Sequence, residues 1–103
     1  MVEGDDFVTI SGWAVEEINK VKDSRIKIIL KDDRSAYVSE TNLKFRPDVT
    51  AFLKSPINID QCGFEAKISK QGLTKGKYQI GIAIYQKDNA GIVKFTGQFI
   101  TKN

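Results

Sequence analysis

The chain has 103 residues, 41% of them hydrophobic, with a formal net charge of +3, no histidine and one cysteine. This length fits one domain that buries about two-thirds of the surface of its unfolded chain. A single cysteine excludes an internal disulfide, and the lack of histidine excludes the Ser-His and Cys-His pairs of common hydrolases. The composition therefore predicts a domain held together by packing and poor in groups for covalent catalysis.

The first six residues are acidic and lack the basic and apolar regions of a signal peptide. We expect residues 1–6 to be a leader that is either disordered or foreign to the native protein, and residues 7–101 to form a single domain. No stretch approaches the roughly 20 apolar residues that cross a bilayer. A cytoplasmic protein and a piece of a longer chain both remain open.

The first predicted strand, residues 7–15, contains a glycine in its middle. Glycine within a strand often marks a bulge, and a bulge at Gly12 would turn Trp13 toward the same interior as Val8 and Ile10. We therefore predict that Trp13 fills the core. The alternative is an exposed Trp13 that stacks on a sugar ring.

Alternation of apolar and polar residues predicts five further strands. They span residues 25–31, 36–41, 63–69, 77–86 and 92–101, and residues 56–59 would add a short edge strand. Turns are expected at residues 32–35 and 88–91, where Asp, Asn, Ser and Gly gather. In the last strand, Val93, Phe95 and Phe99 share one face.

The strongest strand pattern, residues 77–86, has two unlike faces. Tyr78 lies on the isoleucine-rich face, which we expect to point into the core. The opposite face, which carries Tyr85, is small and uncharged for a surface in contact with water. Either a neighbouring module or partner covers it, or the loops of its own domain shield it.

Strands joined by short polar turns, with no helical period between them, indicate two packed sheets. The predicted fold class is all-β: an immunoglobulin-like or fibronectin-like two-sheet sandwich of six or seven strands, with a short helical turn near residues 48–54. A barrel is the less favoured alternative.

The segment of residues 45–55 interrupts the strand pattern. Pro47 suits the start of a turn, and Asp48 can cap it. The apolar residues spaced to cover one end of the core are Val49, Phe52 and Leu53. In a structural role Arg46 pairs with Asp48 or donates to backbone carbonyls beneath the crossover, and in a functional role it holds an anionic ligand group. Because the segment supplies its own carboxylate, we interpret it as a corner that carries the chain from one sheet to the other.

Catalysis would have to rest on carboxylates. The candidates are Asp5, Asp6, Asp32, Asp33, Asp48 and Asp60. They lie in predicted turns or termini, where Asp braces the backbone, and no zinc, calcium or phosphate-loop spacing surrounds them. We predict no catalytic residue, no metal, no cofactor and no enzymatic activity. A small hydrolase using two of these acids is the rival hypothesis.

Three stretches, in this order, carry a resemblance. They are Gly12-Trp13-Ala14, Arg46-Pro47-Asp48-Val49-Thr50 and Gly76-x-Tyr78-x-Ile80-Gly81-Ile82. From about residue 7 to residue 100 the chain resembles a bacterial immunoglobulin-like β-sandwich module. That module is appended to the C-terminus of multi-pass envelope membrane proteins, including glycosyltransferases of the mannosyltransferase type. The resemblance implies a non-catalytic accessory domain on the extracytoplasmic face of a membrane.

The functional hypothesis is an interaction domain that packs on the rest of its own chain or binds an envelope glycan. By residue type, the contact candidates are Tyr37, Arg46, Asp48 and Tyr85. We expect a monomer as an isolated domain and no direct insertion into a membrane. Scattered lysines argue against a nucleic-acid partner. If the chain is complete, a cytoplasmic protein-binding domain is the alternative.

Overall fold

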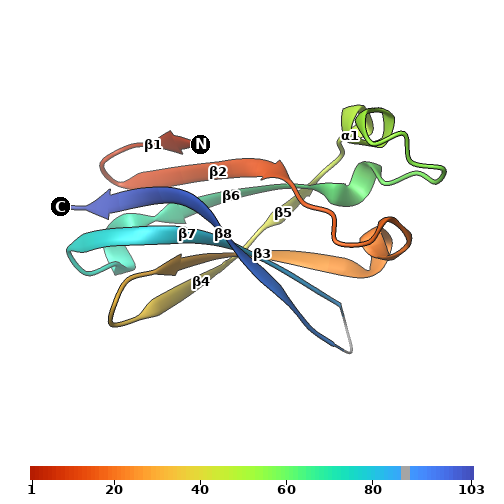
Figure 1. The fold of residues 1–103 in the computed structure, drawn as a ribbon. Helices are drawn as coiled ribbons and strands as arrows, with labels where there is room; N and C mark the ends of the chain where they lie inside the picture. Colours follow the sequence, from red (N-terminus) through yellow and green to blue (C-terminus); the bar gives the residue numbers. More distant parts are fainter. Residues whose placement is uncertain (87–88) are drawn as a thin grey trace.

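The computed structural model describes residues 1–86 and 89–103, which form two four-stranded antiparallel sheets (Figure 1). One sheet has the order β1-β2-β6-β5, made of Val2–Glu3, Phe7–Trp13, Gly63–Ser69 and Asn42–Lys44. The other has the order β4-β3-β7-β8, made of Ala36–Glu40, Ser24–Lys31, Gly76–Gln86 and Asn89–Lys102. The prediction of an all-β, two-sheet fold is confirmed.

Short helical turns connect the strands. They are α1 (Pro47–Phe52) and the 3-10 turns η1 (Ile18–Asp23), η2 (Asp60–Cys62) and η3 (Lys70–Gly72). The helical turn expected near residues 48–54 is thus present as α1. None of the helices in the described residues is long and apolar enough to span a membrane.

The main core lies between the two sheets and takes side chains from both. Its members are Val8, Ile10, Ile28, Leu30, Phe64, Ala66, Leu73, Tyr78, Ile80 and Ile100. Within each strand these residues alternate with outward-facing ones, as the period of a β-strand requires. A second, smaller cluster of Val21, Val49, Ile59 and Cys62 fills the end of the sandwich beneath α1.

Tyr78 fixes the start of β7. Its side chain is fully buried, and its ring lies edge-on to Tyr37 with 5.7 Å between the ring centroids. The Tyr78 hydroxyl donates a hydrogen bond of 2.7 Å to the carbonyl oxygen of Thr74 and lies 2.8 Å from the Thr74 hydroxyl. The buried polar atom is therefore satisfied, and the prediction that Tyr78 faces inward is confirmed.

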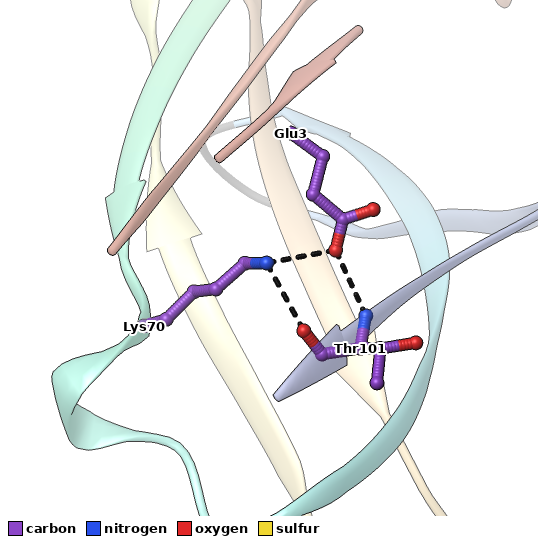
Figure 2. A network of polar contacts seen from close by, with 3 residues as sticks. All are labelled: Glu3, Lys70 and Thr101. Atoms are coloured by element: carbon purple, nitrogen blue, oxygen red, sulfur yellow. Dashed lines mark hydrogen bonds and ion pairs between the residues drawn. The ribbon is translucent and has the colours of Figure 1, made fainter. Parts of the chain in front are cut away.

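Glu3, Lys70 and Thr101 form a polar cluster where the first and last strands meet (Figure 2). The Lys70 side chain is almost fully buried; its ammonium group donates 2.8 Å to Glu3 Oε2 and 3.0 Å to the Thr101 carbonyl oxygen. The same Glu3 oxygen accepts a 2.9 Å hydrogen bond from the Thr101 amide. This Glu3–Lys70–Thr101 clasp ties β1 to β8. The expectation of a disordered leader at residues 1–6 does not hold for Val2–Glu3, because these residues pair with β2.

The prediction that Trp13 fills the core is wrong. β2 pairs with β6 in unbroken register from Phe7 to Trp13, so there is no bulge at Gly12. The Trp13 side chain therefore points outward, 37% exposed, with its ring edge against Phe52 at 6.4 Å between centroids. The Phe64 ring lies beside Gly12, where a Cβ would be in ordinary van der Waals contact with it at 3.4 Å.

The predicted strand count is also wrong, because residues 1–86 and 89–103 form eight strands rather than six or seven. β1 and β5 contain two and three residues and are too short to show a period. Residues 56–59 form no strand; there the Ser55 hydroxyl bonds locally to both the amide and the carbonyl of Ile57. The turn expected at 88–91 includes Asp88, which lies outside the described residues.

The chain changes sheets at Thr41, the single residue between β4 and β5, and not at residues 45–55. The Thr41 hydroxyl donates 2.7 Å to the Ile26 carbonyl oxygen and fixes this crossing. Residues 45–55 join β5 to β6 within one sheet. The expectation that Phe52 and Leu53 cover the core is wrong as well, because only one side of the short α1 faces inward, through Val49.

Candidate functional site

The four contact candidates from the sequence do not come together. Tyr37 lies on the inner face of β4 against Tyr78, whereas Tyr85 lies on the outer face of β7. Arg46 and Asp48 lie at α1 and bind each other, with hydrogen bonds of 2.9 Å and 2.8 Å between the guanidinium and the carboxylate. This pair lowers the pKa of Asp48 and raises that of Arg46, so both charges are already engaged.

Two of the other candidate carboxylates, Asp32 and Asp60, also take part in local hydrogen bonds. Asp32 accepts hydrogen bonds from the backbone amides of Arg34 and Ser35, which lower its pKa. Asp60 accepts a 2.6 Å hydrogen bond from the Thr50 hydroxyl. In the described ranges no group of three or more His, Cys, Asp or Glu side chains could hold a metal ion.

The outer surface of the β4-β3-β7-β8 sheet has an unusual composition. We call it the lysine–aromatic face, made by Arg25, Lys27, Ile29, Lys31, Val38, Lys77, Tyr85, Val93, Phe95 and Phe99. The pairing registers bring these residues onto one side from four neighbouring strands. Large apolar side chains that gather on one exposed face, rather than singly, mark a contact surface.

Each of three aromatic rings on this face carries a lysine. The Lys27 ammonium lies 5.0 Å from the Tyr85 ring centroid. The corresponding distances are 5.8 Å for Lys31 over Phe95 and 4.4 Å for Lys77 over Phe99. All three are within the range of a cation–π interaction. The arrangement holds the positive charges above apolar rings instead of dispersing them in solvent.

A glycine explains how Phe95 reaches the middle of the sheet. Phe95 pairs with Gly81 across the β7–β8 ladder, and a Cβ on Gly81 would meet the Phe95 ring at 3.0 Å. The missing side chain lets the ring lie across β7 toward Ile29, while 43% of Phe95 stays exposed. The small, uncharged face of β7 seen in the sequence is thus partly shielded by its own neighbouring strand.

The face is also positively charged. Its cations are Arg25, Lys27, Lys31 and Lys77. Among the described residues on this side of the sheet, only Glu40 is acidic; it pairs with Lys27 at 3.2 Å and raises the Lys27 pKa. The uncompensated cations favour an anionic partner.

A second exposed apolar region lies at the end of the sandwich near α1. It includes the Trp13–Phe52 ring pair together with exposed Phe45, Leu53 and Ile57. The segment of residues 44–60 that supplies most of it carries charges of both signs, including Lys44, Lys54, Asp48 and Asp60. This end therefore has apolar surface for packing but no charge preference.

Sequence reasoning missed most of the lysine–aromatic face. Its grouping of Val93, Phe95 and Phe99 on one side of the last strand is confirmed, and Tyr85 belongs to the same face. The alternation along β8 was enough to place these apolar residues on one side. The lysines that cover the rings come from β3 and β7, so the pattern of β8 does not reveal them.

No protein-family model, curated protein or solved structure matches the chain. The function of the lysine–aromatic face has to be inferred from its own geometry and charge.

Proposed function

We propose that the protein is a non-catalytic binding module with an immunoglobulin-like fold, and that its lysine–aromatic face binds an anionic glycan of the bacterial envelope. The observation that carries this proposal is the set of three lysine–ring pairs on one exposed sheet face. Flat rings can stack on the C–H faces of sugars, and ammonium groups can pair with sugar carboxylates or phosphates. An open sheet face that spans four strands suits an extended polymer better than a small compact ligand.

Two features support the immunoglobulin-like assignment. Read along the chain as A to G with a C′ strand, the two sheets have the orders A-B-E-D and C′-C-F-G, which are those of immunoglobulin sandwiches. Tyr78 at the start of the F-equivalent strand bonds to the backbone four residues upstream, as in a tyrosine corner.

The state of the carboxylates supports a non-catalytic role. A glycosidase needs one acid with a raised pKa and a second one about 5 to 10 Å away. Here the pKa values of Asp32 and Asp48 are lowered, and each group is bound within its own turn. These side chains act as braces for the backbone and for Arg46.

We further propose that the module belongs to a larger envelope membrane protein and acts on its extracytoplasmic side. The resemblance described above motivates this proposal, and the exposed Trp13–Phe52 end offers apolar surface for packing on the rest of such a chain. The reading frame upstream of Met1 tests it. Several apolar spans of about 20 residues would support it, and a frame without any would contradict it.

Glycan binding is tested by titrating the ¹⁵N-labelled protein with polygalacturonate as an acidic polymer and with mannan as a neutral one. We expect polygalacturonate to shift the amide resonances of Lys27, Lys31, Lys77, Phe95 and Phe99, and to bind less tightly as salt is added. The double variant Phe95→Ala/Phe99→Ala should bind at least about tenfold more weakly, because both stacking rings are lost.

The matched control is Phe7→Ala on the other sheet. Phe7 is likewise exposed and carries Lys67 at 4.7 Å from its ring, so it tests whether any lysine-covered ring suffices. Its loss should leave binding unchanged. Equal shifts on both sheets, or no shifts with either polymer at millimolar sugar concentration, would refute the proposed face. If a single-stranded oligonucleotide binds more tightly than polygalacturonate, the ligand of this face is a nucleic acid and not a glycan.

A further inference from the structure

One half of β6 has no neighbour on its outer side. β6 runs from Gly63 to Ser69 and pairs with β2 along its whole length. On the other side, β5 pairs only with Gly63, Phe64 and Glu65, because the chain enters this sheet only after Thr41. Next to residues 66–69 the position of a further strand is therefore vacant among the described residues.

The hydrogen-bonding groups of this vacant edge can be assigned from the ladder. Two hydrogen bonds at the ends of the β2–β6 ladder show which residues direct their backbone groups toward β2. The Lys70 amide donates to the Asp6 carbonyl, and the Cys62 carbonyl accepts from the Ala14 amide. Antiparallel pairing alternates along a strand, so Ala66 and Ile68 also direct their backbone groups toward β2. The backbone groups of Lys67 and Ser69 consequently point toward the vacant side.

A hollow of about 400 Å³ adjoins this edge. Its lining comes from β4 through Tyr37 and Ser39, from β6 through Ile68, and from Leu73 after η3. The floor is apolar where Leu30, Ile68 and Leu73 contribute to the lining. The space lies where β5 would continue above the inner face of β4, so it can accept a side chain from an added strand.

The outward side of the edge carries a charge. Lys67 lies over the Phe7 ring and takes part in no ion pair within the described part of the chain. In the half of β6 that pairs with β5, the next outward residue is Glu65. It forms an ion pair with Lys44 of β5 at 3.7 Å. An acidic side chain opposite Lys67 would repeat this cross-strand pairing with the charges exchanged.

We propose that the vacant edge binds an extended peptide of a partner protein as an added strand. The peptide would place an apolar side chain opposite Ile68, into the hollow, and an acidic one opposite Lys67. Its main chain would pair with the backbone groups of Lys67 and Ser69, which is the mode of β-strand addition. This site is separate from the lysine–aromatic face and does not depend on glycan binding there.

Amide hydrogen exchange of the free protein gives the first test. We expect the amides of Lys67 and Ser69 to exchange at least about tenfold faster than those of Ala66 and Ile68, which bond to β2. Equal protection of all four amides would mean that the edge is already closed, and would overturn the proposal.

The second test uses the blocked peptide acetyl-Gly-Val-Thr-Leu-Glu-Gly-amide at millimolar concentration. Its addition should slow exchange at Lys67 and Ser69 and shift their amide resonances, while residues of the lysine–aromatic face stay unchanged. A peptide with lysine in place of glutamate should bind about threefold more weakly. In the exposed Lys67→Glu variant this preference should reverse. Absence of any change at Lys67 and Ser69, or an unaltered preference in the variant, would contradict the inference.

Discussion

Replacement of Tyr78 by alanine is expected to lower the free energy of unfolding by about 4 kcal/mol. The ring is fully buried in the core and lies edge-on to Tyr37, so its removal leaves a cavity between the two sheets. A domain of this kind has a total stability of about 5–15 kcal/mol, so a loss of this size removes a large share of it. Urea unfolding followed by tryptophan fluorescence, with Trp13 as the probe, measures the change.

The variant Tyr78→Phe separates the hydroxyl group from the ring. It keeps the packing and removes only the hydrogen bond to the Thr74 carbonyl, at an expected cost of about 1 kcal/mol. If both variants unfold at the same urea concentration as the native protein, the burial of Tyr78 at the start of β7 is contradicted. If Tyr78→Phe costs as much as Tyr78→Ala, the hydroxyl and not the ring dominates.

The clasp at β1 gives the second large effect. Glu3→Ala is expected to lower the free energy of unfolding by about 3 kcal/mol, because it leaves the Lys70 ammonium buried without its carboxylate. Only 3% of Lys70 is exposed, and its other polar contact is the Thr101 carbonyl oxygen. Denaturant unfolding of the variant measures the loss.

A double variant serves as the control. In Glu3→Gln/Lys70→Met the charge is removed together with its partner, so no uncompensated ion remains in the interior. We expect this protein to be more stable than Glu3→Ala alone. A double variant that is less stable than Glu3→Ala would show that the hydrogen bond from Lys70 to the Thr101 carbonyl oxygen, rather than the ion pair with Glu3, determines the stability at this position.

The same clasp predicts a pH dependence. Hydrogen bonds from Lys70 and then from the Thr101 amide lower the pKa of Glu3 below its usual value of 4.5. A carboxyl group with a lowered pKa in the folded state stabilises the fold above its unfolded-state pKa, and this contribution is lost as the pH falls through the folded-state pKa. The native protein should therefore lose stability on acidification below about pH 4.5, and Glu3→Gln should lose less over the same interval.

The sequence was sufficient for the long strands of the core. Residues 63–69 were predicted with the bounds of β6, and the inward face of β7 was predicted through Tyr78. In these segments the alternation continues over seven or more residues, so one face is decided by burial alone. The two-sheet arrangement follows from several such strands.

Local pattern failed where another part of the chain decides the outcome. Trp13 points outward because the β2–β6 register continues without a bulge through Gly12, where Gly12 pairs with Phe64. β5 exists only because the chain changes sheets at Thr41 and meets the start of β6. In both cases the pairing strand is β6, and it cannot be identified from the residues near Trp13 or Thr41.

The candidate sites show the same limit. Tyr85 was selected by residue type, but its significance comes from Lys27 on the neighbouring strand and from Phe95 beyond it. Arg46 and Asp48 were selected for the same reason, and the predicted bond between them is confirmed. A surface that several strands build together can be predicted only when the pairing order of the strands is known. The residue pattern of one strand does not contain that order.

The hydrogen bond between Glu3 and Thr101 joins residues 98 positions apart and brings the two ends of the described chain to the same end of the sandwich (Figure 1). Mechanical tension applied through both ends would load this clasp before it reached the β2–β6 and β7–β8 ladders. The clasp would therefore yield first under stretching, and the two sheets would keep their shape after it opened.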